Sequence, residues 1–134
     1  MPPLHLSCCL FATIVVHAYY RQVESYHHIF LALTISSVLF HTTHGETVRK
    51  VDKFLAHVSY IMVVMDTPKA VESDAQWLLV FPFLAACAWF GQSLLPDRKD
   101  VLQLCLHLVG VIGMHFYLWV LYPNRLILLP RIND

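Results

Sequence analysis

Ser37, His41, Asp52 and His107 are the residues of this chain whose types and spacing could support catalysis. Ser37 and His41 are four residues apart and therefore share one face of a helix, whereas His57 is five residues after Asp52 and is turned away from it. Two imidazoles, a carboxylate and a water can hold zinc, which lowers the pKa of that water toward ~7. A metal-bound hydroxide attacking a carbonyl is the reaction class that these groups would suit.

Asp52 borders an apolar stretch that is too short to cross a membrane without it or another acidic residue. The uncharged stretch 54–65 is much shorter than the ~20 residues that a helix needs to cross a bilayer, so a span here must include Asp52 or Asp66. A carboxylate drawn into hydrocarbon is costly and survives where it has polar partners, which makes it a functional residue by default. The alternative is that Asp52 lies in the headgroup layer beside Lys50 and Lys53 as a helix N-terminal acid.

Composition predicts an integral membrane protein. Hydrophobic residues make up 57% of the chain, charged residues only 13%, and the mean hydropathy is +0.58. We predict an all-α, multi-pass transmembrane bundle of about five spans, forming a single domain over residues 1–134 with membrane lipids as its partners. The predicted spans are residues 4–20, 27–43, 51–66, 77–95 and 101–122. The net charge of zero gives no indication of a nucleic-acid partner.

Alternating span directions sort the polar residues onto two sides. Side A, which holds the N-terminus, receives His41, Asp52 and His107 from three different spans. Side B receives an aromatic belt that consists of Tyr19, Tyr20, Tyr26, Trp77, Trp119 and Tyr122. We also expect a kink at Pro82 and an interfacial tail over residues 123–134.

The N-terminal stretch and the cysteines carry no processing or disulfide signal. Residues 1–20 lack a basic region and a clean small-residue cleavage site, so we interpret them as a retained first span. The cysteines all lie in apolar segments without C-x-x-C spacing, which predicts buried free thiols, with acylation near the first two as the alternative. They are Cys8, Cys9, Cys87 and Cys105.

Two segments resemble a known group of membrane proteins. Ser37-Val38-Leu39-Phe40-His41, followed by Val51-Asp52 and the residues up to His57, resembles the Ser-x-x-x-His and downstream Asp of the CREST superfamily. That superfamily includes alkaline ceramidases, adiponectin and progestin receptors, haemolysin III and myomaker-like proteins. The segment from Leu106-His107 to His115 is similar to the final helix of those proteins, which carries further histidines.

The resemblance implies a helical bundle that holds zinc with three histidines near one membrane face and, in several members, hydrolyses lipid amides or esters. It implies that His41 and His107 are metal ligands, that Ser37 is the hydrogen-bonding companion of His41, and that Asp52 polarises the attacking water. The chain departs from the family in two ways. It has about five predicted spans where the family has seven, and Gln103 stands where the family has a second histidine before His107. His115 is no simple replacement, because eight residues along a helix separate it from His107 by ~12 Å and ~80°.

Two other functions stay open at this stage. A haem-binding electron carrier could use His57, His107 and His115 as axial ligands, with Gly110 and Gly113 leaving space for the macrocycle. A noncatalytic bundle would use His107 for an interhelical hydrogen bond and small residues such as Ser37 for close helix packing.

Overall fold

The computed structural model describes residues 2–123, with side chains from residue 9 onward, and this part of the chain is all helical and contains no strand. The predicted all-α fold class is therefore confirmed. The elements are α1 (Pro2–Tyr20), α2 (Glu24–Thr43), α3 (Glu46–Met65), α4 (Thr67–Glu72), the 3₁₀ turn η1 (Gln76–Leu79), α5 (Val80–Leu94), the 3₁₀ turn η2 (Pro96–Arg98) and α6 (Lys99–Leu121).

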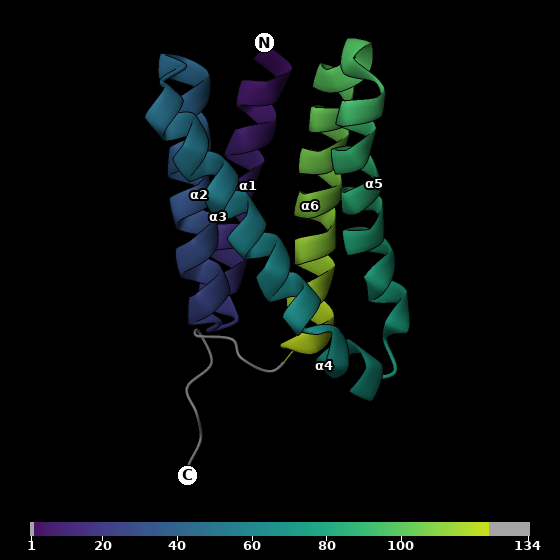
Figure 1. Cartoon of the computed structure of the whole chain (residues 1–134). Helices are drawn as coiled ribbons and strands as arrows, with labels where there is room; N and C mark the ends of the chain where they lie inside the picture. The colour runs from purple at the N-terminus through teal and green to yellow at the C-terminus, as the bar shows by residue number, and fades with distance from the viewer. Residues whose placement is uncertain (1, 124–134) are drawn as a thin grey trace.

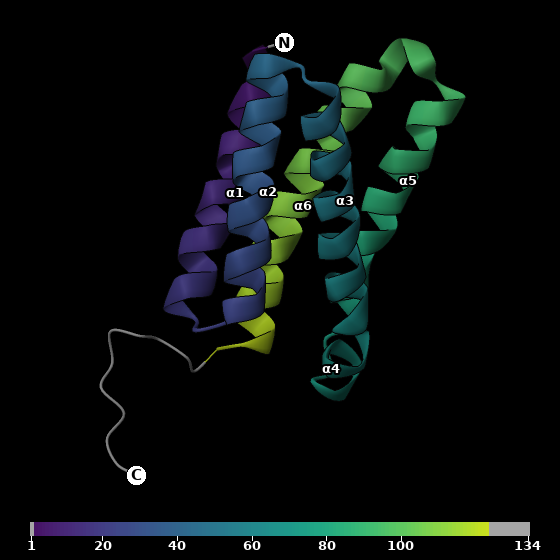
Figure 2. The ribbon, with the colours of Figure 1, turned by 60° about the vertical axis from the view of Figure 1, so that its left-hand side comes forward.

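The five long helices run alternately down and up (Figure 1). Neighbouring pairs pack along their lengths: α1 with α2, α2 with α3, α5 with α6, and α1 with α6. Figure 2 shows α1 and α2 side by side, with α3 standing between α2 and α5. We call the end that holds the start of α1 the A end; the end of α2 and the starts of α3 and α6 also lie there. The opposite end, with α4, is the B end (Figure 1).

Each predicted span falls on one of these long helices, but their apolar character differs. Two stretches within the described residues are long and apolar enough to cross a membrane, Gln76–Leu94 and Pro96–Leu121, and Cys9–Tyr20 is a shorter apolar helix. That these helices span a membrane, and that the chain crosses it about five times, remains a prediction.

The core forms where the apolar face of α1 meets α6. Phe11, Ile14 and Ala18 recur at helical spacing and are almost fully buried. They pack in one cluster with α2 residues and with the buried face of α6, which consists of Val111, Met114, Tyr117, Leu118 and Leu121. The histidines of α1 and α6 flank this seam, so the packing of the core sets their positions.

Pro82 falls in the first turn of α5 rather than in the middle of a long helix. The chain changes from 3₁₀ to α conformation just before it, at Val80, and the Tyr60 hydroxyl donates to the Pro82 carbonyl at 3.1 Å. A proline is tolerated in a first turn because the backbone N–H that it lacks has no helical partner there. Residues 124–134 of the predicted interfacial tail, and the Cys8 side chain, lie outside the described residues. Cys9, Cys87 and Cys105 are free thiols as predicted, but they are exposed on the bundle and not buried.

Gly113 is the point of closest approach between α5 and α6. A Cβ atom there would lie 2.7 Å from the Phe81 Cβ, whereas a Cβ at Gly110 would have nothing within 4 Å. We expect Gly113→Ala to lower the free energy of unfolding by ~1–3 kcal/mol because the two helices must separate. Gly110→Ala, on the same helix, should be neutral or stabilising by about 0.5–1 kcal/mol. Denaturant unfolding in detergent micelles checks both, and equal effects would contradict the close contact.

Candidate functional site

Asp52 points into the contact between α2 and α3. Its Oδ1 accepts a hydrogen bond from Ser37 Oγ at 2.5 Å and lies 3.0 Å from Ser36 Oγ, whose single proton is shared between Asp52 and the Leu33 carbonyl at 3.1 Å. Both serines are buried, at 6% and 3% exposure, while the neighbouring Lys50 and Lys53 are exposed. Hydrogen bonds to an ionised carboxylate are roughly twice as strong as neutral ones. The Asp52 side chain is thus held toward α2 by hydroxyls, whereas the two lysine side chains are directed outward.

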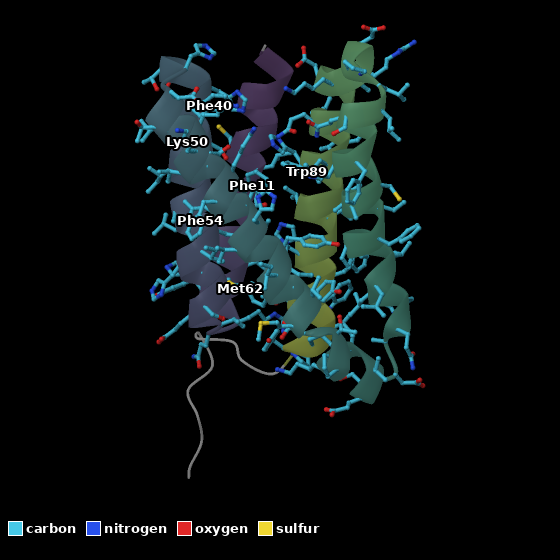
Figure 3. The ribbon with its side chains drawn as sticks, in the orientation of Figure 1. Phe11, Phe40, Lys50, Phe54, Met62 and Trp89 are labelled. Carbon is cyan, nitrogen blue, oxygen red and sulfur yellow. The ribbon has the colours of Figure 1, made fainter. Side chains whose placement is uncertain are left out.

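His107 is buried in α6 at 7% exposure, with the Phe11 ring edge-on to it at 5.2 Å. Phe11 points from α1 into the centre of the bundle (Figure 3). A chain of two amides reaches the imidazole, because Gln92 Nε2 donates to Gln103 Oε1 at 2.8 Å and Gln103 Nε2 lies 3.0 Å from His107 Nε2. Gln92 thereby fixes the orientation of the Gln103 amide, so the Gln103 N–H donates to Nε2 and a neutral His107 carries its proton on Nδ1.

His41 lies in the last turn of α2, one turn beyond Ser37, and is half-buried. It is close enough to His107 to act on it electrostatically. Helices α2, α3 and α6 therefore bring the four predicted site residues to the A end, with Ser37 and Asp52 in direct contact. Among residues whose side chains are described, no three or more His, Cys, Asp or Glu side chains are grouped closely enough to hold a metal ion. Two imidazoles are fewer than the three protein ligands usual in catalytic zinc sites.

His57 lies away from this group. It is exposed on α3, its Nδ1 donates to the Lys53 carbonyl at 2.7 Å, and its ring meets Trp89 of α5 edge-on at 5.0 Å. This position agrees with the five-residue spacing from Asp52. Glu46, at the start of α3, is paired with Arg49, which holds the pKa of the Glu46 carboxyl below its usual value.

An apolar groove lies beside the serine–aspartate pair. It has a volume of about 410 Å³ and is formed by the outer faces of α2 and α3. Ser36, whose hydroxyl lies 3.0 Å from Asp52 Oδ1, is one of the residues that line it. The other lining residues are Ala32, Ile35, Leu39, Thr47, Val48, Val51 and Leu55.

His115 belongs to a second histidine site, on the seam of α1 and α6. Its Nδ1 lies 2.8 Å from His17 Nδ1 and its Nε2 lies 2.8 Å from Thr13 Oγ1. Both ring nitrogens are thus hydrogen-bonded, and neither is open to act as an axial haem ligand without breaking one of these contacts. Sequence spacing gave no indication of this pair, because it depends on the register of α1 against α6.

Asp66, at the B end of α3, is held like Asp52 by two hydroxyls. Tyr26 OH donates to its Oδ2 at 2.5 Å and Tyr122 OH donates to the same atom at 3.1 Å, while Lys69 Nζ lies 3.9 Å from the centre of the Tyr122 ring. Tyr26 and Tyr122 are buried, at 2% and 9% exposure, and so are not part of an exposed aromatic belt. The other predicted belt residues are exposed: Tyr19, Tyr20, Trp77 and Trp119.

No protein-family model, curated protein or solved structure matches this chain. The CREST resemblance therefore rests on the short Ser37, His41 and Asp52 pattern together with His107.

Proposed function

We propose that this chain is an integral membrane protein that crosses the bilayer about five times. The exterior of the bundle supports this proposal, because large apolar side chains are exposed along the helices, including Phe54 at 66%, Phe90 at 67% and Leu94 at 79%. The two most apolar helical stretches are only 22% and 39% buried within the bundle. A core helix of a soluble protein would be mostly buried, whereas a lipid-facing helix keeps its apolar surface outward.

We further propose that the A-end site is a zinc-dependent hydrolase site of CREST kind that acts on an amide or ester bond of a membrane lipid. The observation that carries the proposal is the contact of Asp52 with two buried serine hydroxyls, those of Ser36 and Ser37. This contact lies at the end of the bundle where His41 and His107 also lie. Three helices contribute to this polar group, and polar groups inside a membrane bundle mark functional sites.

The residues would divide the chemistry as follows. His41 and His107 would be zinc ligands, and a bound zinc would supply Lewis-acid activation of a water. Ser36 and Ser37 occupy Oδ1 of Asp52, and among described side chains no group donates to its Oδ2. Asp52 can therefore accept a proton from water at Oδ2 while the serines hold the carboxylate in place. This is the role of a general base.

The groove between α2 and α3 supports a lipid as substrate. Its apolar lining suits an acyl chain, and its volume of about 410 Å³ is in the range of small-molecule sites. The groove shares Ser36 with the serine–aspartate contact.

One observation favours a second candidate, a noncatalytic protein of the same kind. The Gln103 amide donates to the Nε2 atom of His107, so it occupies the lone pair with which that nitrogen would bind a metal. A bundle that uses His107 only for this hydrogen bond would have the same fold without hydrolysis.

The test is hydrolysis by the full chain in lipid vesicles that carry either N-acyl or O-acyl lipids. Release of fatty acid that is lost on treatment with a zinc chelator and restored by added zinc is the expected result. Absence of release from every lipid, with the chain folded, would favour the noncatalytic candidate.

A further inference from the structure

The second histidine site, on the seam of α1 and α6, is a row of hydrogen bonds in which every bond has the same donor-to-acceptor direction. Its anchors are Thr13, whose hydroxyl donates to the Leu10 carbonyl at 2.6 Å, and Arg21, whose Nε donates to His17 Nε2 at 3.4 Å. A guanidinium can only donate and a carbonyl can only accept, so the two ends define which atoms between them carry protons.

The proton positions follow link by link. The single hydroxyl proton of Thr13 goes to Leu10, so Thr13 Oγ1 must accept from Nε2–H of His115. A neutral His115 then has a bare Nδ1, which must accept from Nδ1–H of His17 across 2.8 Å. A neutral His17 in turn has a bare Nε2, and this is the atom that faces Arg21.

We propose that His17 and His115 form a proton-transfer pair. His17 takes up a proton from the B end and passes it from α1 to His115 on α6. Uptake of a proton from water at His17 Nε2 breaks the bond from Arg21. The Nδ1 proton of His17 then crosses to Nδ1 of His115. His17 is neutral again with its proton on Nε2, and the positive charge rests on His115, which still donates to Thr13. The reverse steps return the proton to water.

The surroundings limit the pair to one added proton. Two added protons would set two N–H groups against each other across 2.8 Å, so the second must be taken up at much lower pH. Arg21 is the charged group that acts on His17, and it also donates to the carbonyls of Tyr122 and Pro123 after α6. From α2, which packs on α1, the nearby titratable group is His27, whose Nδ1 donates to the Val15 carbonyl.

Both histidines are half-buried, and the site stands apart from the A-end residues. The two rings are nearly parallel, with centroids 5.0 Å apart and planes at 20°, and they meet through their Nδ1 atoms, which are 2.8 Å apart. The inference therefore does not depend on zinc or on hydrolysis at the A end.

The test is nitrogen-15 NMR of the full chain in lipid nanodiscs with labelled histidine. At neutral charge the proton should lie on Nδ1 of His17 and on Nε2 of His115, and acidification should shift both rings together over one pH range. Reversed proton positions, or two rings that titrate independently, would overturn the proposal.

Two variants of Arg21 test whether its charge acts on the proposed site of proton uptake, His17 Nε2. Arg21→Gln removes the neighbouring positive charge and should move the shared transition upward by about one pH unit. Arg21→Lys retains the charge and should leave the transition close to that of the wild type. A transition that does not move in Arg21→Gln would contradict the contact of Arg21 with His17 Nε2, and with it the proposed site of proton uptake.

Discussion

Replacing Asp52 by asparagine should lower lipid hydrolysis by ~10²–10⁴-fold, the usual contribution of a general base. The amide oxygen of asparagine can still accept the hydroxyls of Ser36 and Ser37, which now donate to Asp52 Oδ1 at 3.0 and 2.5 Å. The variant should therefore fold, but an amide cannot take a proton from water. Initial rates of fatty-acid release from vesicles, at equal protein content, measure the effect.

Asp66→Asn is the matched control for this substitution. Asp66 lies on the same chain segment as Asp52 and also accepts two hydroxyls, from Tyr26 and Tyr122, but at the B end. Its replacement should leave the rate of hydrolysis within a few-fold of wild type. Equal losses in the two variants would mean that the carboxylates stabilise the bundle and that neither takes part in chemistry.

Replacing Gln103 by histidine should tighten zinc binding, because it adds a third imidazole one helical turn before His107. Gln103 already reaches the His107 ring at 3.0 Å, so a side chain at this position lies on the correct face of α6. We expect zinc affinity to rise by ~10–100-fold or more, since even outer-shell partners of a metal change affinity by that factor. Competition with a fluorescent zinc chelator measures the change.

Gln103→Leu is the control, because it removes the same amide from His107 without supplying a ligand. It should leave zinc affinity unchanged or raise it slightly by freeing Nε2 of His107. Equal affinities in Gln103→His and Gln103→Leu would contradict the placement of the zinc site on this face of α6.

The sequence was sufficient to predict the helical fold class and the arrangement of the polar groups at the A end. Apolar stretches separated by short charged loops define the long helices. Their alternating directions place the end of α2 and the starts of α3 and α6 at the same end of the bundle. The short uncharged stretch 54–65 predicts that a span here must include Asp52 or Asp66. Both side chains accept hydroxyl hydrogen bonds, while the span itself remains a prediction.

The contacts that depend on helix register could not be predicted in the same way. Spacing within one helix placed Gln103 on the same face as His107, but not Gln92 of α5 against it. It likewise gave no reason to pair His17 with His115, because their contact depends on how α1 slides along α6. Spacing also gave no indication that the Ser36 hydroxyl, next to Ser37, reaches the Asp52 carboxylate.

The zinc content of the purified full chain tests the central claim most directly, because the proposed reaction requires His41 and His107 to hold one ion together. The expected result is about one zinc for each wild-type chain, with loss of that zinc in both His41→Ala and His107→Ala, and full retention in His57→Ala. A wild-type chain without zinc, or undiminished zinc in either of the first two variants, would contradict the proposed site.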